Sequence, residues 1–456
     1  MRIMRTLMYG AVASALLTSG SALAAVSAEE AAKLGDTLTK IGATKAGNGD
    51  EIPAWDGGLT QSPAGFNPDD GRYIDPFPED KELFRIDQSN VDEYSENLTP
   101  GQVAMIKTYD DYFIPVYQTR RTATYPEQVI QQTMENATQV ELVESGNGMK
   151  NYQTATPFPI PQNGLEVIFN HLTRYRGGSI DRNVAQVTPQ PNGDFSAVKF
   201  TESFTERVAL SDYDPSDDPN VMFYFKQGIT APSRLAGNVL LVHETINQVK
   251  EPRRAWLYNS GQRRVRRAPN VAYDGPGTAA DGQRTADNLD LYNGAPDKYN
   301  WELVGKKEIY IPYNSYRAAS GELDYDDIVK PGHVDQSLTR YELHRVWHVK
   351  ATLKDEERHV YEQRDFFIDE DSWQISLIDH YDGRGNLWRV AEAHTMQMYH
   401  PNANTPGYAF ETLYDLLSGR YLVMGLTNEE DEPYVYGTER SSREYTPAAL
   451  RRSGVR

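Results

Sequence analysis

The chain has 456 residues, a formal net charge of -19 at pH 7 and no cysteine. The phosphates of a nucleic acid and the surface of an anionic membrane would both repel such an acidic chain, which argues against either as a partner. The absence of cysteine excludes disulfides, thiol catalysis, cysteine-ligated zinc and a lipid-modified N-terminal cysteine.

Residues 1–24 predict a cleavable secretory signal. Arg2 and Arg5 form a positive start, residues 11–17 form a short apolar core, and Ala22-Leu23-Ala24 supplies small residues for cleavage. The apolar core is shorter than the roughly 20 residues that a membrane-spanning helix needs. We therefore expect a mature chain that begins near Ala25 and is soluble in the periplasm, without a lipid anchor. A retained N-terminal anchor is the alternative.

The region 25–190 predicts helices separated by long loops. Capping patterns and apolar spacing indicate helices at residues 29–38, from Thr99 onward, at 124–136 and at 165–175. The stretch 47–80 is rich in glycine, proline and aspartate, which favours an irregular path.

The region 191–427 predicts an antiparallel β body. Apolar and polar residues alternate with the period of half-buried strands, most clearly at 341–353, 360–368, 373–381 and 387–398. Further strands are expected at 238–247, 254–258, 263–268 and 301–312, with edge strands at 409–413 and 421–426. Between them, residues 268–300 form a loop long enough to suggest function or mobility. Residues 428–456 read as a poorly ordered polar tail, and no linker divides the single domain 25–456.

Catalytic and metal-binding motifs are not found. His344 and His348 have the spacing of a helical metal pair, but in a strand they stand about 13 Å apart, too far to share one ion. The acidic run Asp212, Asp214, Asp217 and Asp218 is interpreted as a solvated loop, with a calcium site as the less favoured alternative. We expect no enzyme activity, no metal and no cofactor.

Two groups of residues are candidates for function. The first is a set of apolar residues in or beside the strands, which would line a cavity or else form a solid core: Trp256, Trp301, Leu343, Trp347, Phe367, Trp373 and Leu377. The second group is basic and would dock an acidic partner or an anionic head group, unless nearby acids neutralise it: Arg263, Arg264, Arg266 and Arg267.

Several stretches resemble a family of uncharacterised proteobacterial periplasmic proteins described as outer-membrane lipoprotein-sorting-like. The resemblance spans nearly the whole mature chain. It is carried by residues 52–59, 253–258, 266–269, 310–316, 367–373, 379–388 and 418–422.

Membership of this family implies a distant relation to the lipoprotein carriers LolA and LolB. The fold class that follows is α+β: a large curved antiparallel sheet forming an incomplete barrel, with N-terminal helices packed on or closing its concave face. The function that follows is a periplasmic carrier for a lipid or another hydrophobic compound. Its expected partners are an inner-membrane exporter of the resistance-nodulation-division type and an outer-membrane protein. A non-catalytic scaffold of an envelope complex is the alternative, and a secreted hydrolase is a less favoured one.

Overall fold

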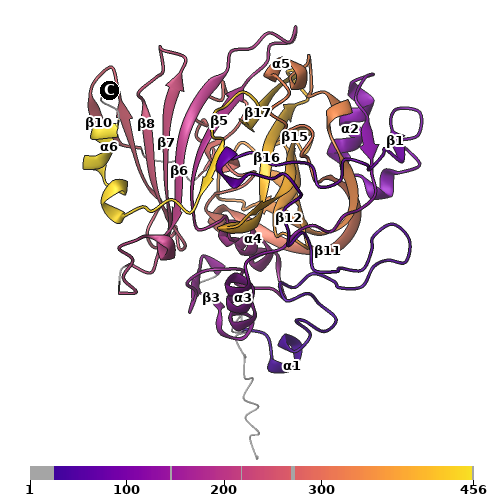
Figure 1. Ribbon diagram of the computed structural model, residues 1–456, viewed down its shortest axis with the longest axis horizontal. Coiled ribbons are helices and arrows are strands. Elements are labelled where there is room, and N and C mark those ends of the chain that lie inside the picture. The colour runs from indigo at the N-terminus through magenta and orange to yellow at the C-terminus, as the bar shows by residue number, and fades with distance from the viewer. Residues whose placement is uncertain (1–24, 144–145, 217, 269–272, 454–456) are drawn as a thin grey trace, which may run out of the picture.

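One large sheet forms the body of the molecule (Figure 1). The computed structural model describes residues 25–143, 146–216, 218–268 and 273–453, so the predicted signal at residues 1–24 lies outside the described residues. Within that part of the chain the sheet has 16 strands. They are β1 (Phe84–Ile86), β2 (Ile114–Val116), β5 (Ser179–Val187), β6 (Val198–Glu206), β7 (Val221–Ala231), β8 (Val239–Thr245), β9 (Arg254–Asn259), β10 (Arg264–Arg267), β11 (Tyr299–Pro312), β12 (Tyr341–Leu353), β13 (Gln363–Asp369), β14 (Ile375–Tyr381), β15 (Leu387–His400), β16 (Ala403–Asp415), β17 (Arg420–Leu426) and β18 (Tyr434–Tyr436).

The sheet is curved and open rather than closed into a barrel. Its strand order is β1-β2-β12-β13-β14-β15-β16-β17-β5-β6-β7-β8-β9-β10, with β11 beside β12 and β18 beside β5. All of these pairings are antiparallel except the short contact between β2 and β12. The end strands β1 and β10 do not pair with each other, and Figure 1 shows β5–β10 on one side of the molecule and β11, β12 and β15 on the other.

The helices are few and support the sheet from its ends and faces. They are α1 (Ala28–Ala31), α2 (Pro100–Thr108), α3 (Glu127–Gln139), α4 (Gly164–Thr173), α5 (Tyr325–Ile328) and α6 (Pro447–Ser453), and a small hairpin of β3 (Glu141–Val143) and β4 (Gly148–Lys150) follows α3. α4 packs against β11 and β12, α2 packs against β14 and β15, and α6 packs against β8–β10. The predicted α+β fold, an incomplete antiparallel barrel with helices packed on it, is therefore confirmed.

The described part of the long loop predicted at residues 268–300 packs on the sheet. We call its residues 273–298 the plug segment. Leu291 and Tyr292 of this segment are fully buried in one core cluster with Val167 and Ile168 of α4 and Phe366 of β13. We call the sheet face that the plug segment and α4 cover the inner face. This packing creates the candidate site.

Two local predictions need correction. The helix expected at residues 29–38 ends at Ala31, because Gly35 takes a left-handed φ of 85° and turns the chain back. The expected tail forms β18 and α6, because Tyr434, Tyr445 and Leu450 supply buried apolar anchors. Among the described residues, no helix has the length and apolar character needed to span a membrane.

Candidate ligand-binding site

Of the seven apolar residues predicted as a cavity lining, four are buried in the core, and Trp256, Trp301 and Trp347 are partly buried and pack against it. They fall into four clusters, one with Trp256, one with Leu343, one with Phe367 and Leu377, and one with Trp301, Trp347 and Trp373. In the last cluster the rings of Trp347 and Trp373 stack at 6.3 Å between centroids, and the Trp373 indole N–H donates to the carbonyl of Ile41 at 2.9 Å.

None of these seven side chains lines the inner cavity or the outer groove described below. Strand alternation identifies residues that share a face of the sheet. It does not indicate which stretch of that face a distant loop will cover. A ligand-binding role for these seven residues stays a prediction.

An inner cavity of about 130 Å³ lies on the inner face, between β5–β8 on one side and β15–β16 on the other. Two neighbouring strands contribute its aromatic wall: Phe204 comes from β6, and Phe223 and Phe225 come from β7. Val242 of β8 adds to the apolar wall, and Leu289 of the plug segment lies across it. The result is a partly open cavity between sheet and loop, with one apolar wall and several polar groups, a typical form for a small-molecule site.

Ion pairs fasten the tip of the plug segment beside this cavity. Arg174 donates to one carboxylate oxygen of Asp290 at 2.5 Å, and Arg176 donates to the other at 2.6 Å. Burial alone would raise the pKa of Asp290, but the two guanidinium groups hold it well below its ordinary value. Asp290 and Leu291 both have left-handed φ values, 56° and 52°. Such strain costs about 1–3 kcal/mol per residue and is often found at ligand clamps.

Several polar atoms at the cavity have no partner among the described residues. Both polar atoms of the Gln374 side chain are buried without a hydrogen bond, as are Oδ1 of Asn293 and Nε of Arg174. Buried polar groups normally find a partner, because an unsatisfied one costs about 1–3 kcal/mol. The inner cavity thus combines an apolar wall with polar groups free to bind a ligand.

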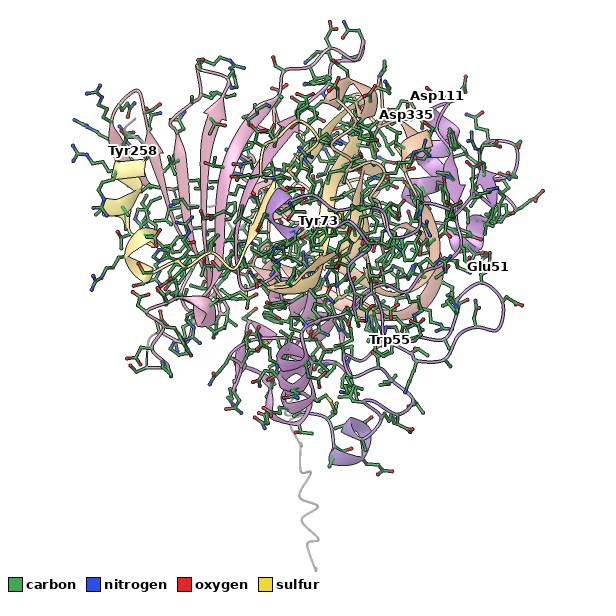
Figure 2. All side chains as sticks on the ribbon, in the orientation of Figure 1. Glu51, Trp55, Tyr73, Asp111, Tyr258 and Asp335 are labelled. Carbon is green, nitrogen blue, oxygen red and sulfur yellow. The ribbon has the colours of Figure 1, made fainter. Side chains whose placement is uncertain are left out.

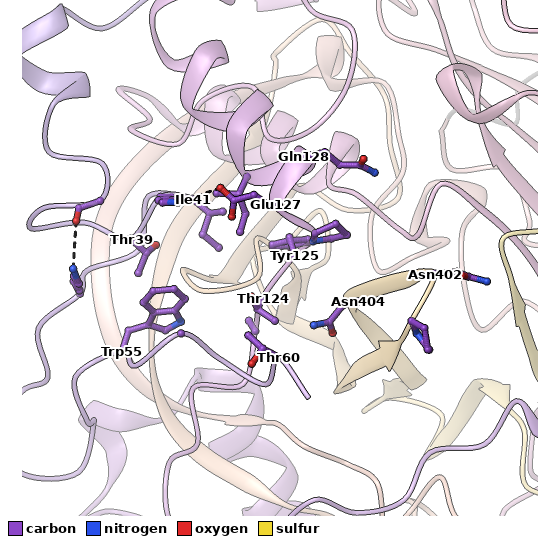
Figure 3. A pocket seen from close by; sticks show the side chains of 18 residues that line it. Thr39, Ile41, Trp55, Thr60, Thr124, Tyr125, Glu127, Gln128, Asn402 and Asn404 are labelled. Atoms are coloured by element: carbon purple, nitrogen blue, oxygen red, sulfur yellow. Dashed lines mark hydrogen bonds and ion pairs between the residues drawn. The ribbon is translucent and has the colours of Figure 1, made fainter. Parts of the chain in front are cut away.

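A second, larger hollow lies at the surface. The outer groove has a volume of about 740 Å³ and runs between the N-terminal loops, the start of α3 and the β15–β16 turn. Figure 3 shows Trp55 on one side of it and Tyr125 and Asn404 on the other; Trp55 is also labelled among the N-terminal loops in Figure 2. Its rim carries the exposed ion pair of Lys40 and Glu127. Because this groove is open and rimmed by exposed polar residues, it would shield an apolar ligand less completely than the inner cavity.

A buried charge network lies on the other part of the sheet, around His344. One ligand atom each from His344, Asp369 and Asp371 lies within 4.8 Å of the others, a spacing that a metal ion could use. These groups are already engaged. Arg121 donates to both carboxylate oxygens of Asp371 at 2.6 and 2.8 Å, Ser372 donates to Asp369 at 2.6 Å, and His344 contacts Glu342 at 3.2 Å. His348 instead pairs with Asp365 at 2.7 Å. The arrangement is that of an ion-pair network.

The predicted basic patch lies at the open edge of the sheet. Residues 254–259 and 264–267 form the expected hairpin of β9 and β10, and Figure 2 marks this edge by Tyr258. Its four arginines are exposed, and in the described part of the chain none of them forms an ion pair: Arg263, Arg264, Arg266 and Arg267. Asp212, from the predicted acidic run, accepts hydrogen bonds from Ser442. Asp217 lies outside the described residues.

Sequence reasoning missed the charged residues of the inner cavity. Arg174, Arg176 and Glu411 belong to no motif, and a chain with 46 basic and 65 acidic residues offers many equivalent candidates. One available signal was the length of the loop at 268–300, which suggested function and which supplies Asp290.

Fold and cavity together define an open, helix-supported antiparallel half-barrel with a chamber on its inner face. The chain belongs to the family described as "Protein of unknown function (DUF1329)", whose model matches residues 85–451. It is 61% identical over 458 residues to the uncharacterized protein PA3922 of Pseudomonas aeruginosa, and the match covers 100% of both chains. The family resemblance predicted from the sequence is therefore confirmed.

Three solved structures are similar to part of the chain, each covering 60% of this chain and 92% of its own. One is described as an outer membrane lipoprotein-sorting protein domain from Vibrio parahaemolyticus, with 12% identity and a TM-score of 0.41. The second is a DUF1329 family protein from Desulfovibrio piger, with 13% identity and a TM-score of 0.40. The third is the LolA superfamily protein NE2245 from Nitrosomonas europaea, with 12% identity and a TM-score of 0.35.

Proposed function

We propose that this protein binds a lipid or another hydrophobic compound in its inner cavity and carries it through the periplasm. The observation that carries the proposal is the aromatic wall of Phe204, Phe223 and Phe225, which lines a partly open cavity on the inner face. A compound held there would have its apolar surface removed from water, at a gain of about 25 cal/mol per Å².

The size of the cavity limits what it can hold. Its volume of about 130 Å³ is close to that of an engineered apolar cavity of about 150 Å³ that binds benzene. It is smaller than the roughly 300–1,000 Å³ of sites for drug-sized ligands. A long acyl chain would therefore extend out of the partly open cavity while its first carbons stay against the aromatic wall.

Filling the cavity is expected to abolish ligand retention. Val242 is buried and lines the cavity, so the Val242→Phe variant places a ring in the ligand's space without introducing charge. Mass spectrometry of organic extracts from the purified mature protein should show a bound hydrophobic compound. Its amount should fall at least about tenfold in the variant, as expected for loss of a well-fitted apolar contact.

The matched control is Val435→Phe, which adds the same ring at an exposed position of β18. This control should retain the compound. The proposal would be overturned by a native protein that carries no compound, or by equal retention in Val242→Phe and the native protein.

Docking to an acidic partner is the second candidate function, and the unpaired arginines at the β10 edge favour it. Such a partner would be part of an envelope export system, with an exporter of the resistance-nodulation-division type and an outer-membrane protein as proposed components. The double charge reversal Arg264→Glu with Arg266→Glu is expected to abolish capture of this partner from periplasmic and membrane extracts. Capture that stays unchanged would count against docking through this edge.

A further inference from the structure

Arg284 is a buried cation without an anionic partner. The residue is 5% exposed, and its Nη1 donates to the carbonyl of Thr285 at 3.2 Å. Its Nε has no hydrogen-bond partner, and no carboxylate of the described residues forms an ion pair with it. Burying an unpaired charge is costly, so a protein normally pairs it or neutralises it. Arginine is too basic to lose its proton, so Arg284 requires an anion.

The carboxylates near Arg284 are already taken. Arg182 donates twice to Glu202, at 3.0 and 2.5 Å, and Gln227 donates to the other oxygen of Glu202 at 2.7 Å. Asp287 of the plug segment pairs with Arg364 at 2.9 Å and with His359 at 3.1 Å.

Glu411 is the third nearby acid, and it is mostly protonated at neutral pH. Burial raises its pKa to about 8, and the charge of Asp290 adds to the rise. The protonated group carries no negative charge to offset Arg284. None of the three carboxyl groups therefore neutralises this arginine.

Arg284 lines a small chamber that adjoins the inner cavity. The chamber has a volume of about 40 Å³, and Arg182, Leu289, Tyr408 and Glu411 line both spaces. One water molecule occupies about 10–15 Å³ by this measure, so the chamber has room for about three non-hydrogen atoms. A carboxylate group has that size.

We propose that this chamber binds the carboxylate of an anionic amphiphile whose apolar chain lies in the inner cavity against Phe204 and Phe225. Arg284 supplies the unpaired positive charge, and Arg182 at the shared boundary adds a second guanidinium group. Guanidinium groups match the geometry of a carboxylate and bind it through charge-assisted hydrogen bonds. This inference rests on the proposed function and assigns it a class of ligand. Because the protein has a net charge of -19, an anion needs such a local cation to enter.

Calorimetric titration at pH 7.5 with decanoate and with 1-decanol tests the head group, since these ligands share a chain and differ in charge. The native protein is expected to bind decanoate at least about tenfold more tightly, the effect of one charged hydrogen bond. Arg284→Met should remove that preference and leave the affinity for 1-decanol unchanged. The matched control Arg384→Met, in the exposed turn between β14 and β15, should bind both ligands as the native protein does.

Thermal unfolding of Arg284→Met supplies a readout that does not depend on binding. Because this change removes a buried unpaired charge, the variant should be at least as stable as the native protein.

Equal binding of both ligands by the native protein would overturn the carboxylate assignment and leave the proposed function standing. If neither ligand binds, both the carboxylate assignment and the proposed function are overturned. Tighter binding of decyl phosphate than of decanoate would overturn the choice of a carboxylate.

Discussion

Replacing Arg121 with methionine is expected to lower the free energy of unfolding by about 3–5 kcal/mol, the usual cost of removing one partner of a buried ion pair. The Arg121 side chain is only 2% exposed, and it donates twice to Asp371. It also donates to the carbonyls of Thr44, Lys45 and Pro53, at 2.8, 3.4 and 3.3 Å. One guanidinium group therefore fastens the N-terminal loop to the end of β13, and methionine would leave Asp371 charged and unpaired.

Urea denaturation measures this loss, and a second substitution identifies its cause. If the cost comes from the stranded carboxylate, the double variant Arg121→Met with Asp371→Asn should be more stable than Arg121→Met alone. Arg85→Met is the control, because Arg85 is 47% exposed and its pair with Glu82 is a surface pair worth at most about 1 kcal/mol. A loss of less than about 1 kcal/mol in Arg121→Met would contradict the assignment.

The sheet was predictable where a single local rule determines it. The alternation in residues 341–353 and 387–398 gave strands that match β12 and nearly match β15, although β15 is buried on both sides along most of its length. The capping pattern at Thr99 likewise located α2, where the Thr99 and Gln102 side chains cap each other's backbone N–H.

The site was not predictable in the same way, because contacts distant in sequence create it. The apolar residues of the plug segment do not recur at a regular spacing, so the local sequence does not indicate that Leu291 is fully buried. Its burial depends on Arg174 and Arg176, more than 100 residues earlier, which bind Asp290. The same holds for Trp373, which belongs to a solid core because Ile41 of the N-terminal loop covers it.

Stability is expected to fall as the pH rises from about 5 to 8.5, and Glu411, with the highest pKa of the four buried acids concerned, is expected to contribute the largest single share. Burial raises the pKa values of four acids, those of Glu206, Asp379 and Glu392 to about 7 and that of Glu411 to about 8. Their ordinary values are 4.5 for glutamate and 3.8 for aspartate. At a pH between the ordinary pKa and the raised pKa, the folded protein keeps a proton on the acid that the unfolded protein has released. Raising the pH through this window therefore favours unfolding.

The Glu411→Gln variant should lose most of the pH dependence of stability that Glu411 contributes, because glutamine keeps the shape of the protonated acid and cannot ionise. The groups that face Glu411 are Asp290, which raises its pKa, and Arg182, Arg284 and the Leu291 N–H, which lower it. We expect the variant to match the native protein at pH 5 and to exceed its free energy of unfolding by about 2–4 kcal/mol at pH 8.5. Urea denaturation across this range measures the difference, with Glu322→Gln at an exposed position as the control.

Parallel pH profiles for Glu411→Gln and the native protein would mean that Glu411 is ionised in the folded state. In that case Glu411 would already neutralise Arg284, and the chamber would have no unpaired charge left for a ligand carboxylate.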